Sequence, residues 1–510
     1  MDIAENLLNP MDFESLINGL ADPAFELPRN ANAVVSGVTM DSRQVRPGDL
    51  FIACFGSNHD AREFIGDAVA AGAVAVLAES GGRWQGLTMT GNVPVLALDG
   101  LSARISEIAA RFYGRPSERL HVMGITGTNG KTSCSQFIAQ AMTVMGQRCG
   151  VIGTLGYGLY NQLEETTHTT PDAIFTQAAL SRMLREGMDP VVMEVSSVGL
   201  HQNRVKAVRF DTAIFTNLTR DHLDYHHSME NYADNKRKLF TMDGLRAAVV
   251  NLDDPYALTM LNGVARNVEV LTYSIKNSVA TVYAKELQFT RHGYRAEVCT
   301  PLGSGILSGP LIGKFNFSNV LAVLATLVSY QEHRGKADLQ QLLNVICGLK
   351  PVTGRMEIIG NSADITAIVD YAHTPDGLRS ALLAVRDHFE GNIWCVFGCG
   401  GNRDKGKRPM MGDIAEQLAN QLIIADDNPR NEQGDEIIQH ILSGITDKSR
   451  ALVIRDRSRA IEYAITRAAP GDIVLVAGKG HENYQDVGGR RMVFSDASQV
   501  RLALQKRASN

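Results

Sequence analysis

A glycine-rich stretch near residue 130 carries the strongest chemical signal in the sequence. Residues 127–132 have the order Gly-Thr-Asn-Gly-Lys-Thr. The apolar run at 120–125 predicts a buried strand before this loop, and apolar residues at helical spacing from Cys134 to Met145 predict a helix after it. Glycines let backbone N–H groups turn toward a phosphate, and a helix start adds donors and partial positive charge. Lys131 can reach the β- and γ-phosphates of a nucleotide, and the Thr132 hydroxyl can bind Mg²⁺.

The loop departs from the general phosphate-loop pattern. The glycine expected six residues before Lys131 is Ile125, so only the Gly-Lys-Thr end of the pattern is present. An ordinary strand-to-helix turn is the alternative. The strand, the three glycines at 124, 127 and 130 and the following helix together favour a phosphate site.

The composition is that of a globular protein with several domains. The 510 residues suggest two to four domains, with 44% hydrophobic and 21% charged residues. The net charge of −5 and the lack of a basic run argue against a nucleic-acid partner. The N-terminus lacks a signal-peptide layout, and no apolar run approaches the ~20 residues that span a bilayer, so no membrane partner is expected. The seven scattered cysteines predict reduced thiols and a cytoplasmic protein.

Strand-like runs in the first 115 residues end beside polar residues. The runs 50–55, 73–77 and 93–98 predict strands, and 61–71 predicts a helix, which together make a small α/β unit. Polar loops at strand ends are candidates for ligand contact, and simple turn chemistry is the alternative. The candidate residues of this unit are Met40, Ser42, Asn58, His59 and Asp60.

In the middle of the chain, apolar runs again end beside polar residues. The run 190–193 ends at Glu194, and 212–215 leads to His222. Because ligands collect at the carboxyl ends of parallel strands, both side chains could approach a metal held by Thr132; a structural histidine is the alternative. Lys236 lies in a polar segment whose composition predicts a solvated helix face. Asn316 and Asn319, three residues apart, can point to one side of a helix.

The last third again places polar residues after apolar runs. Asp370 follows 367–369, and the loop 398–409 combines glycines with Arg403, Lys405, Lys407 and Arg408. These cations suit an anionic ligand, and a solvated basic loop is the alternative. Cys395 and Cys399 are predicted to be small buried residues, because no second pair completes a zinc spacing.

Taken together, these motifs resemble those of the Mur ligase family. They are 127–132, Glu194-Val195-Ser196-Ser197, 217–224 (Asn-Leu-Thr-Arg-Asp-His-Leu-Asp), Asn316-x-x-Asn319, 354–357 (Gly-Arg-Met-Glu), 370–376 (Asp-Tyr-Ala-His-Thr-Pro-Asp) and 427–430 (Asp-Asn-Pro-Arg). The resemblance implies an α/β fold of three domains. These are an N-terminal UDP-binding domain (1–115), a central P-loop ATPase-like domain with a parallel sheet (116–350) and a C-terminal Rossmann-like domain (351–510) that binds an amino acid.

The resemblance also implies an activity. It is the ATP- and Mg²⁺-dependent joining of meso-2,6-diaminopimelate to UDP-N-acetylmuramoyl-L-alanyl-D-glutamate, through an acyl phosphate, in peptidoglycan precursor synthesis. The implied partners are these small molecules, and we expect a monomer. A carboxylate and an amine do not condense in water without activation, so ATP must first phosphorylate the acid. Lys131 and Mg²⁺ would offset the repulsion between the two anions.

The resemblance assigns roles to individual residues. The residues implied to bind ATP are Gly127, Thr128, Asn129, Gly130, Lys131, Thr132, Ser133, Asn316, Arg355 and Asp370. The residues implied to bind the UDP-muramoyl-dipeptide are Met40, Ser42, Asn58, His59, Asp60, His168, Thr169, Thr170, Ser196, Gln202 and Arg204. The residues implied to bind diaminopimelate are Arg403, Asp427, Asn428, Pro429, Arg430, Gly478 and Glu482. The implied catalytic residues are Lys131, Glu194, His222 and Lys236, and the implied metal ligands are Thr132, Glu194, His222 and Lys236 as a carbamate.

The choice of amino acid is predicted to rest on Arg430. Diaminopimelate differs from lysine by a second carboxylate, which a guanidinium can bind with two parallel hydrogen bonds. Glu482 could hold the ammonium of the same distal stereocentre.

Two other functions remain open at this point. Another amide ligase of the superfamily, either lysine-adding or like folylpolyglutamate synthetase, would use the same phosphate loop, although synthetases of that kind usually lack the first domain. A nucleotide-binding regulator without turnover would need neither Arg430 nor the loop 478–482.

Overall fold

The computed structural model describes the chain except residues 1–9, 21–26, 57–58, 167, 362–363 and 510. Internal contacts divide the chain into two compact units. The first unit consists of Met1–Gly124, Gly146–Ala213 and Lys238–Arg246, and the second of Ile125–Met145, Ile214–Arg237 and Ala247–Asn510. None of the helices in the described part of the chain is long and apolar enough to cross a membrane.

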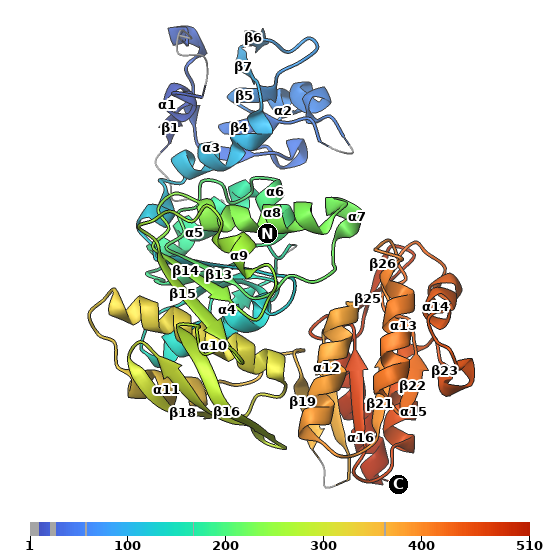
Figure 1. The fold of residues 1–510 in the computed structure, drawn as a ribbon. Helices are drawn as coiled ribbons and strands as arrows, with labels where there is room; N and C mark the ends of the chain where they lie inside the picture. Colours follow the sequence, from blue (N-terminus) through green and yellow to red (C-terminus); the bar gives the residue numbers. More distant parts are fainter. Residues whose placement is uncertain (1–9, 21–26, 57–58, 167, 362–363, 510) are drawn as a thin grey trace. The chain divides into compact units, whose positions relative to one another are not determined.

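The N-terminal part of the first unit is a five-stranded sheet with helices on both faces (Figure 1). Its strand order is β3-β4-β5-β7-β6, parallel except for β6. The strands are β3 Gly37–Thr39, β4 Asp49–Ala53, β5 Ala75–Glu79, β6 Leu87–Thr90 and β7 Val93–Leu98. The helices are α1 Phe13–Ile17, α2 Ile65–Ala70 and α3 Ile105–Phe112, and a short pair β1 Met11–Asp12 and β2 Val34–Val35 stands apart. The predicted small α/β unit is confirmed.

An eleven-stranded mixed sheet has the order β11-β10-β9-β12-β8-β13-β14-β15-β16-β17-β18. Its strands are β8 Val122–Thr126, β9 Gly150–Gly153, β10 Gly156–Leu159, β11 Gln162–Glu164, β12 Val191–Glu194, β13 Thr212–Phe215, β14 Ala247–Asn251, β15 Glu269–Ser274, β16 Val282–Thr290, β17 Gly293–Thr300 and β18 Gly303–Gly309. The helices along the same part of the chain are α4 Lys131–Val144, α5 Ala173–Arg185, α6 Ser197–His201, α7 Leu223–His226, α8 Met229–Arg237, α9 Ala257–Leu261, α10 Lys314–Glu332 and α11 Leu339–Cys347.

The expected parallel sheet is correct only for part of this sheet. β14 pairs with β15 in parallel, whereas β16, β17 and β18 form an antiparallel meander. Most residues of β16 and β18 are exposed or half-buried, so these strands lack the continuous apolar runs that predicted β8, β12, β13 and β14. Short 3-10 turns occur at Arg29–Ala31, Ser42–Gln44, Ala61–Phe64, Leu101–Ala103, Pro116–Glu118, Lys238–Thr241 and Lys448–Arg450.

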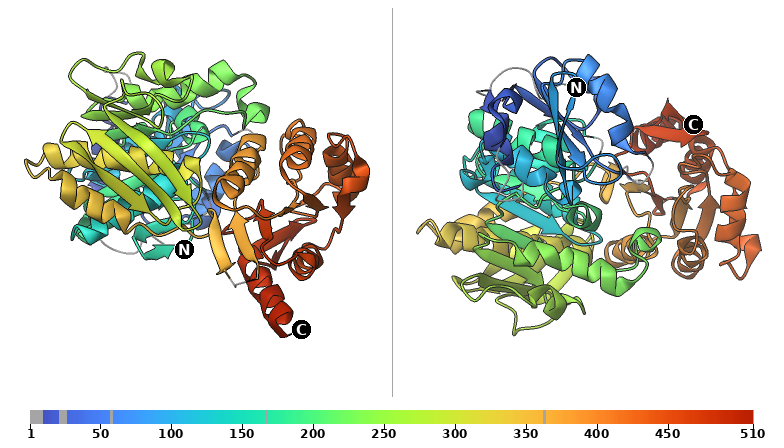
Figure 2. Two further views of the ribbon diagram at one scale, coloured as in Figure 1. Left: turned by 60° about the horizontal axis from the view of Figure 1, so that its bottom comes forward. Right: turned by 90° about the horizontal axis from the view of Figure 1, so that it is seen from above.

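The C-terminal part of the second unit is a six-stranded sheet covered by helices on both faces, as the left view of Figure 2 shows. Its order is β19-β20-β24-β21-β22-β23, with only β19 antiparallel. The strands are β19 Glu357–Asn361, β20 Thr366–Asp370, β21 Ile393–Phe397, β22 Gln421–Ile424, β23 Ala451–Val453 and β24 Ile473–Ala477. The helices are α12 Pro375–His388, α13 Lys407–Leu418, α14 Gly434–Leu442, α15 Arg457–Arg467 and α16 Asp496–Ser509, and a hairpin joins β25 Tyr484–Val487 to β26 Arg490–Val493.

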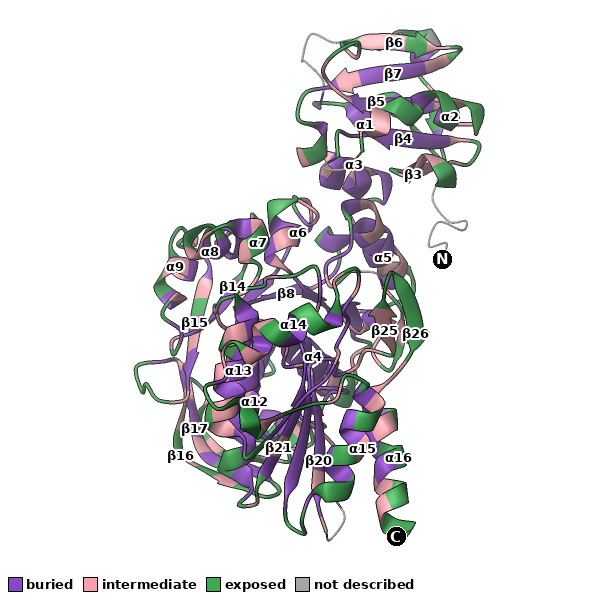
Figure 3. Cartoon of the chain, turned by 90° about the vertical axis from the view of Figure 1, so that its right-hand side faces the viewer, coloured by how far each residue is buried: buried purple, intermediate pink, exposed green. Residues whose placement is uncertain are grey.

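The central strands of this sheet are almost completely buried. Figure 3 shows β20 and β21 buried along most of their length, between helices with exposed outer faces. Strands covered on both faces appear in a sequence as short continuous apolar runs, which is why these strands were predictable. Their carboxyl ends deliver Asp370 and the loop after Phe397 to one edge of the sheet.

A fully buried ion pair links α16 to α15. The guanidinium of Arg457 donates to both carboxylate oxygens of Asp496, at 2.7 and 2.8 Å, and neither side chain is exposed. Replacing Asp496 by alanine would leave a buried charge without its counter-ion. We expect this change to lower the free energy of unfolding by about 3–5 kcal/mol, measured by urea titration. The exposed Glu462, paired with Lys506, is the control, and its alanine variant should lose less than about 1 kcal/mol. Equal losses in the two variants would contradict this expectation.

A buried histidine joins α12 to the start of α10. His388 Nε2 accepts a hydrogen bond from the Gly313 N–H (2.9 Å), and Nδ1 lies 2.6 Å from the Thr290 carbonyl. Only the neutral ring protonated at Nδ1 can make both bonds. Burial lowers the pKa of His388, although nearby Asp387 opposes this effect.

The lowered pKa predicts how stability depends on pH. The unfolded chain binds this proton more readily than the folded chain, so the contribution is complete above about pH 6.5 and is lost as the pH falls below it. We expect the free energy of unfolding to drop by about 1 kcal/mol between pH 7.5 and 5.5 from this site. The His388→Phe variant, followed by urea unfolding at several pH values, should be less stable at pH 7.5 and show a shallower pH dependence. An unchanged pH dependence would show that His388 does not titrate in this range.

Candidate functional site

The glycine loop follows β8 and ends where α4 begins at Lys131, as the sequence predicted. The loop is held by the segment after β13. The Thr128 N–H donates to the Asn217 carbonyl (2.8 Å), and the Asn129 N–H donates to the Asn217 side chain (2.9 Å). Gly127 has φ 150°, and a Cβ there would lie 1.9 Å from Thr216 Oγ1. The loop therefore requires glycine at this point.

Two lysines converge on one carbonyl of this loop. Lys131 Nζ donates to Gly127 O (2.8 Å) and Thr128 O (2.9 Å), and Lys236 Nζ also donates to Gly127 O (2.8 Å). Lys236 is only 1% exposed, so the solvated helix face expected from composition is wrong. Its Nζ lies 4.5 Å from the centre of the Tyr232 ring. Burial, followed by the charge of Lys131, lowers the pKa of Lys236 well below its usual value, which favours a neutral, nucleophilic amine.

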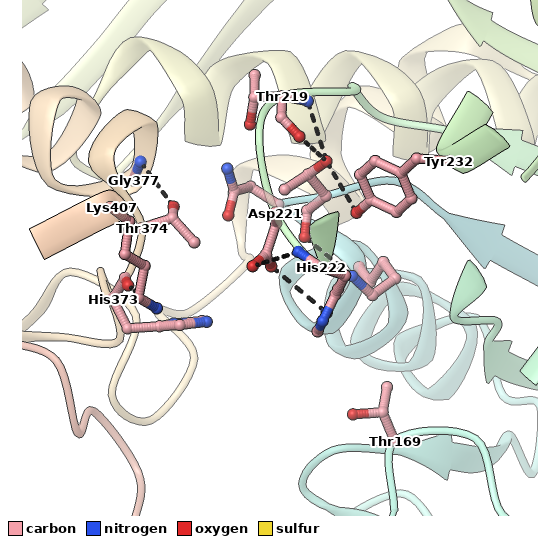
Figure 4. A network of polar contacts seen from close by, with 12 residues as sticks. Thr169, Thr219, Asp221, His222, Tyr232, His373, Thr374, Gly377 and Lys407 are labelled. Carbon is pink, nitrogen blue, oxygen red and sulfur yellow. Dashed lines mark hydrogen bonds and ion pairs between the residues drawn. The ribbon is translucent and has the colours of Figure 1, made fainter. Parts of the chain in front are cut away.

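The predicted motif at 217–224 presents an Asp–His pair beside this loop. His222 Nε2 lies 3.4 Å from Asp221 Oδ2, and His222 has the left-handed backbone angle φ 52°. Figure 4 shows the two side chains together, with Tyr232 on the neighbouring helix. The Tyr232 hydroxyl lies 3.2 Å from Thr128 Oγ1, so the helix that carries Lys236 also contacts the glycine loop.

Two of the residues predicted to bind ATP contact each other. Arg355 Nη2 donates to Thr132 Oγ1 (3.2 Å), and its guanidinium lies 4.3 Å from the centre of the Tyr371 ring. Asp370 is buried and accepts the Met356 N–H (2.7 Å); burial raises the pKa of Asp370, although Arg355 opposes this.

The remaining predicted ATP residues lie on α4 and α10. Ser133 is buried on the first turn of α4. Asn319 Nδ2 donates to Asn316 Oδ1 (3.5 Å), so these two amides do share one side of α10.

Glu194 belongs to the first unit and is fully buried. Its carboxylate accepts the Thr154 N–H (2.9 Å) and the Thr154 hydroxyl (3.1 Å). Its carbonyl accepts the Thr170 hydroxyl (2.9 Å), which in turn accepts the Ser196 N–H (2.9 Å). Two residues predicted for the muramoyl-peptide thus join Glu194 in one network.

The other residues predicted for the muramoyl-peptide surround this network. Arg204 donates to the Thr170 carbonyl (2.7 Å) and to the Gln202 side chain (2.9 and 2.7 Å). Thr169 shares a hydrogen bond with Thr154 (3.0 Å). Partial desolvation, followed by the charge of Arg204, lowers the pKa of His168, whose side chain remains partly exposed.

The residues predicted to contact uridine lie at the carboxyl ends of β3 and β4. Met40 and Ser42 follow β3, and His59 and Asp60 follow β4, whereas Asn58 lies outside the described residues. Asp60 begins a 3-10 turn and forms an ion pair with Arg62 (2.7 Å). The hydrogen bond from Arg62 lowers the pKa of Asp60, so this carboxylate also has the structural role that turn chemistry predicted.

The predicted amino-acid site gathers at the carboxyl ends of β22 and β24. Asn428 Nδ2 donates to Glu482 Oε2 (2.8 Å). Arg430 Nη1 donates to the carbonyls of Gly401 (2.9 Å) and Asn428 (3.5 Å), and Arg430 is half-buried with φ 51°. Within the described residues Arg430 has no carboxylate partner, so its charge is available to a ligand.

Three further predicted residues border this group. Asp427 is buried, Pro429 follows Asn428, and a Cβ at Gly478 (φ 124°) would lie 2.5 Å from Asp427 Oδ2. Arg403 is exposed and donates to the neighbouring Asn402 carbonyl (3.0 Å).

The basic loop after β21 contributes two buried cations that bind partners within the protein. Arg408 is fully buried and binds both carboxylate oxygens of Glu432 (3.0 Å each). Lys407 is buried and donates to the His373 carbonyl (2.8 Å). The solvated loop is wrong for these two residues, since both are buried against partners that are distant in the sequence, and the anionic ligand stays a prediction. Cys395 and Cys399 are buried free thiols, as predicted.

The sequence motifs did not reveal one buried cation of the predicted amino-acid site. Lys479 is fully buried, and its Nζ donates to Asn428 Oδ1 and Glu482 Oε2, both at 2.9 Å. Its position between Gly478 and Glu482 was the available signal. A lysine in a glycine-rich loop ordinarily indicates a solvated residue.

Three segments of the chain match Mur ligase domains. They are residues 34–113 (Mur ligase family, catalytic domain), 125–327 (Mur ligase middle domain) and 354–480 (Mur ligase, glutamate ligase domain). The chain belongs to the Mur ligase family.

Within that family, the similar proteins point to one enzyme. The chain is 46% identical over 471 residues to the UDP-N-acetylmuramoyl-L-alanyl-D-glutamate--2,6-diaminopimelate ligase of Pseudomonas aeruginosa, covering 92% of this chain and 95% of that protein. A solved structure of a ligase with the same name has 35% identity and a TM-score of 0.69, covering 98% of this chain and all of that one.

The folylpolyglutamate synthase of Mycobacterium tuberculosis, solved with ADP and AMPPCP, shares the fold. Its TM-score is 0.60 at 16% identity, and the match covers 74% of this chain and 92% of that one.

Proposed function

We propose that this protein is an ATP-dependent amide ligase that adds meso-2,6-diaminopimelate to UDP-N-acetylmuramoyl-L-alanyl-D-glutamate in peptidoglycan precursor synthesis. The observation that carries the proposal is that Asn428 contacts both Arg430, through its backbone carbonyl, and Glu482, through its side-chain amide. A cation and an anion that contact the same residue are complementary to an amino acid that ends in both a carboxylate and an ammonium. Names of relatives at 46% identity support the same substrates.

The observations disfavour the two alternatives. A regulator without turnover would have no use for this second polar site. Folylpolyglutamate synthase matches only 74% of the chain, and the N-terminal sheet with its polar strand ends supports a further substrate, the uridine nucleotide.

The phosphate side of the reaction is assigned to the glycine loop. In this proposal the N-terminus of α4 and Lys131 bind the triphosphate, with Thr128, Asn129, Gly130, Ser133, Asn316, Arg355 and Asp370 around the nucleotide. Lys131 stabilises the charge that develops when the D-glutamyl carboxylate attacks the γ-phosphate, the bond between the β- and γ-phosphates breaks and ADP leaves. The amine of diaminopimelate then attacks the acyl phosphate and displaces phosphate.

The donor set fits magnesium. A hydroxyl (Thr132), a carboxylate (Glu194), an imidazole (His222) and a carbamate on Lys236 supply mostly oxygen, which Mg²⁺ prefers. Among the described residues no three His, Cys, Asp or Glu side chains form a closed metal site. An Mg²⁺ held by these residues would neutralise phosphate charge and polarise the γ-phosphate.

The remaining assignments complete the proposal. Residues 1–115 bind the uridine nucleotide, 116–350 bind ATP and 351–510 bind the amino acid. The network of Thr170, Ser196 and Arg204 holds the muramoyl-peptide. The setting is the cytoplasm and the enzyme is a monomer; the seven free cysteines are consistent with a reducing compartment.

Phosphate release by the purified protein tests this function. We expect release to require ATP, Mg²⁺, UDP-N-acetylmuramoyl-L-alanyl-D-glutamate and meso-diaminopimelate together, with formation of the tripeptide product seen by mass spectrometry. Release supported equally by lysine would indicate the lysine-adding alternative. Release with a folate substrate would indicate the synthetase, and binding of ATP without any release would indicate a regulator.

A further inference from the structure

The buried lysine of the amino-acid site organises its neighbours. Lys479 Nζ lies 2.9 Å from both Asn428 Oδ1 and Glu482 Oε2, and Asn428 Nδ2 lies 2.8 Å from the same Glu482 oxygen. These three side chains close a triangle of hydrogen bonds. The bond from Lys479 fixes which end of the Asn428 amide accepts, and the Asp486 N–H donates to the same oxygen (2.9 Å).

The two carboxylate oxygens of Glu482 differ in their hydrogen-bond partners. Both side-chain donors that hold this carboxylate within the described residues end on Oε2. A carboxylate accepts about four hydrogen bonds, so Oε1 keeps its capacity for a ligand. The side chain of Glu482 is 16% exposed, whereas that of Lys479 is not exposed. Because its side chain is not exposed, Lys479 cannot contact a ligand directly. It can, however, orient the partly exposed Glu482.

We propose that Lys479 is a positioning residue that, with Asn428, anchors Glu482 Oε2 and leaves Oε1 to receive the distal ammonium of the acceptor amino acid. This inference rests on the proposed function. It divides the recognition of the distal stereocentre between two cations with different roles. Arg430 binds the carboxylate directly, and Lys479 acts on the ammonium through Glu482. The site then rejects lysine for its missing carboxylate and 2-aminopimelate for its missing ammonium.

The experiment compares Lys479→Met with the wild-type enzyme on two acceptors. The acceptors are meso-diaminopimelate and 2-aminopimelate, which lacks the distal amino group, at saturating ATP and UDP-muramoyl-dipeptide. We expect the KM for diaminopimelate to rise about 10- to 100-fold with a smaller change in kcat, because a buried carboxylate loses its anchor. With 2-aminopimelate, kcat/KM should change less than about threefold, since that acceptor makes no use of Glu482. Lys506→Met, which removes the lysine of an exposed Lys–Glu pair on α16, is the matched control and should leave both acceptors unaffected.

Equal losses with the two acceptors would show a purely structural role and overturn the proposal, as would an unchanged KM for diaminopimelate. If Lys479→Met does not fold, Lys479→Gln, whose amide donor is shorter and uncharged, must still raise the KM for diaminopimelate more than the KM for 2-aminopimelate, and equal changes would overturn the proposal. Failure of the wild-type enzyme to use diaminopimelate would overturn the proposed function itself, and that result is visible before any variant is made.

Discussion

The Arg430→Ala variant is expected to lose about 100- to 1,000-fold in kcat/KM for meso-diaminopimelate. Removing one partner of a hydrogen-bonded charge pair costs about 2–5 kcal/mol, and each 1.4 kcal/mol is tenfold. In the structure Arg430 is oriented by the carbonyls of Gly401 and Asn428, so its charge is held in place before a ligand arrives. The Arg430→Lys variant should also lose activity, because an ammonium cannot form the bidentate pair.

The measurement is the initial rate of phosphate release at varied diaminopimelate and at varied ATP. The KM for ATP should stay within about twofold, since Arg430 lies on the amino-acid side. Arg459→Ala, which removes an exposed arginine of α15, is the matched control and should behave as wild type. An unchanged rate with diaminopimelate in Arg430→Ala would show that another residue selects the amino acid.

The Lys236→Met variant is expected to lose at least about 1,000-fold in turnover, the scale of removing a key electrostatic group. Burial and the nearby Lys131 lower the pKa of Lys236, which favours its neutral amine; a neutral amine can add CO₂ and lose a proton to become an anionic carbamate. The carbamate would supply an oxygen ligand for Mg²⁺ at the glycine loop. Methionine has a similar length and cannot carry the modification.

Two measurements separate this role from simple packing. Protein equilibrated with ¹³C-bicarbonate should show a carbamate resonance in the wild type that is missing from Lys236→Met. Lys238→Met is the control, because Lys238 is exposed two residues away and should keep both the resonance and the activity. Wild-type protein without a carbamate resonance would refute the modification, whatever the activity of the variant.

The sequence predicted an element correctly where all the residues that define it are adjacent in the chain. The glycine loop with Lys131 and Thr132 was predictable because the strand, the turn and the helix start are adjacent in the chain. Strands β20, β21, β22 and β24 of the C-terminal sheet were predictable because burial on both faces gives continuous apolar runs, whereas the edge strands β19 and β23 were not predicted. The meander β16–β18 and the hairpin β25–β26 gave no such signal, since each has a solvated face.

The sequence was uninformative where burial depends on distant segments. Lys236 lies in a polar helix and looks solvated, yet its amine reaches the Gly127 carbonyl, 109 residues away in the chain. Arg408 looked like a ligand for anions, whereas Glu432 neutralises it. Lys479 donates to Asn428, which follows a different strand of the sheet. Composition predicts the average environment of a residue type and cannot reveal these individual partners.

The tight fit of Gly127 has a consequence for inhibitors of this enzyme. Any side chain at that position would collide with Thr216, so a single substitution of Gly127 would distort the loop. A compound that bonds to the main-chain atoms of this turn would therefore be hard to escape by resistance at Gly127. Compounds that depend on the exposed Arg403 would have no such protection.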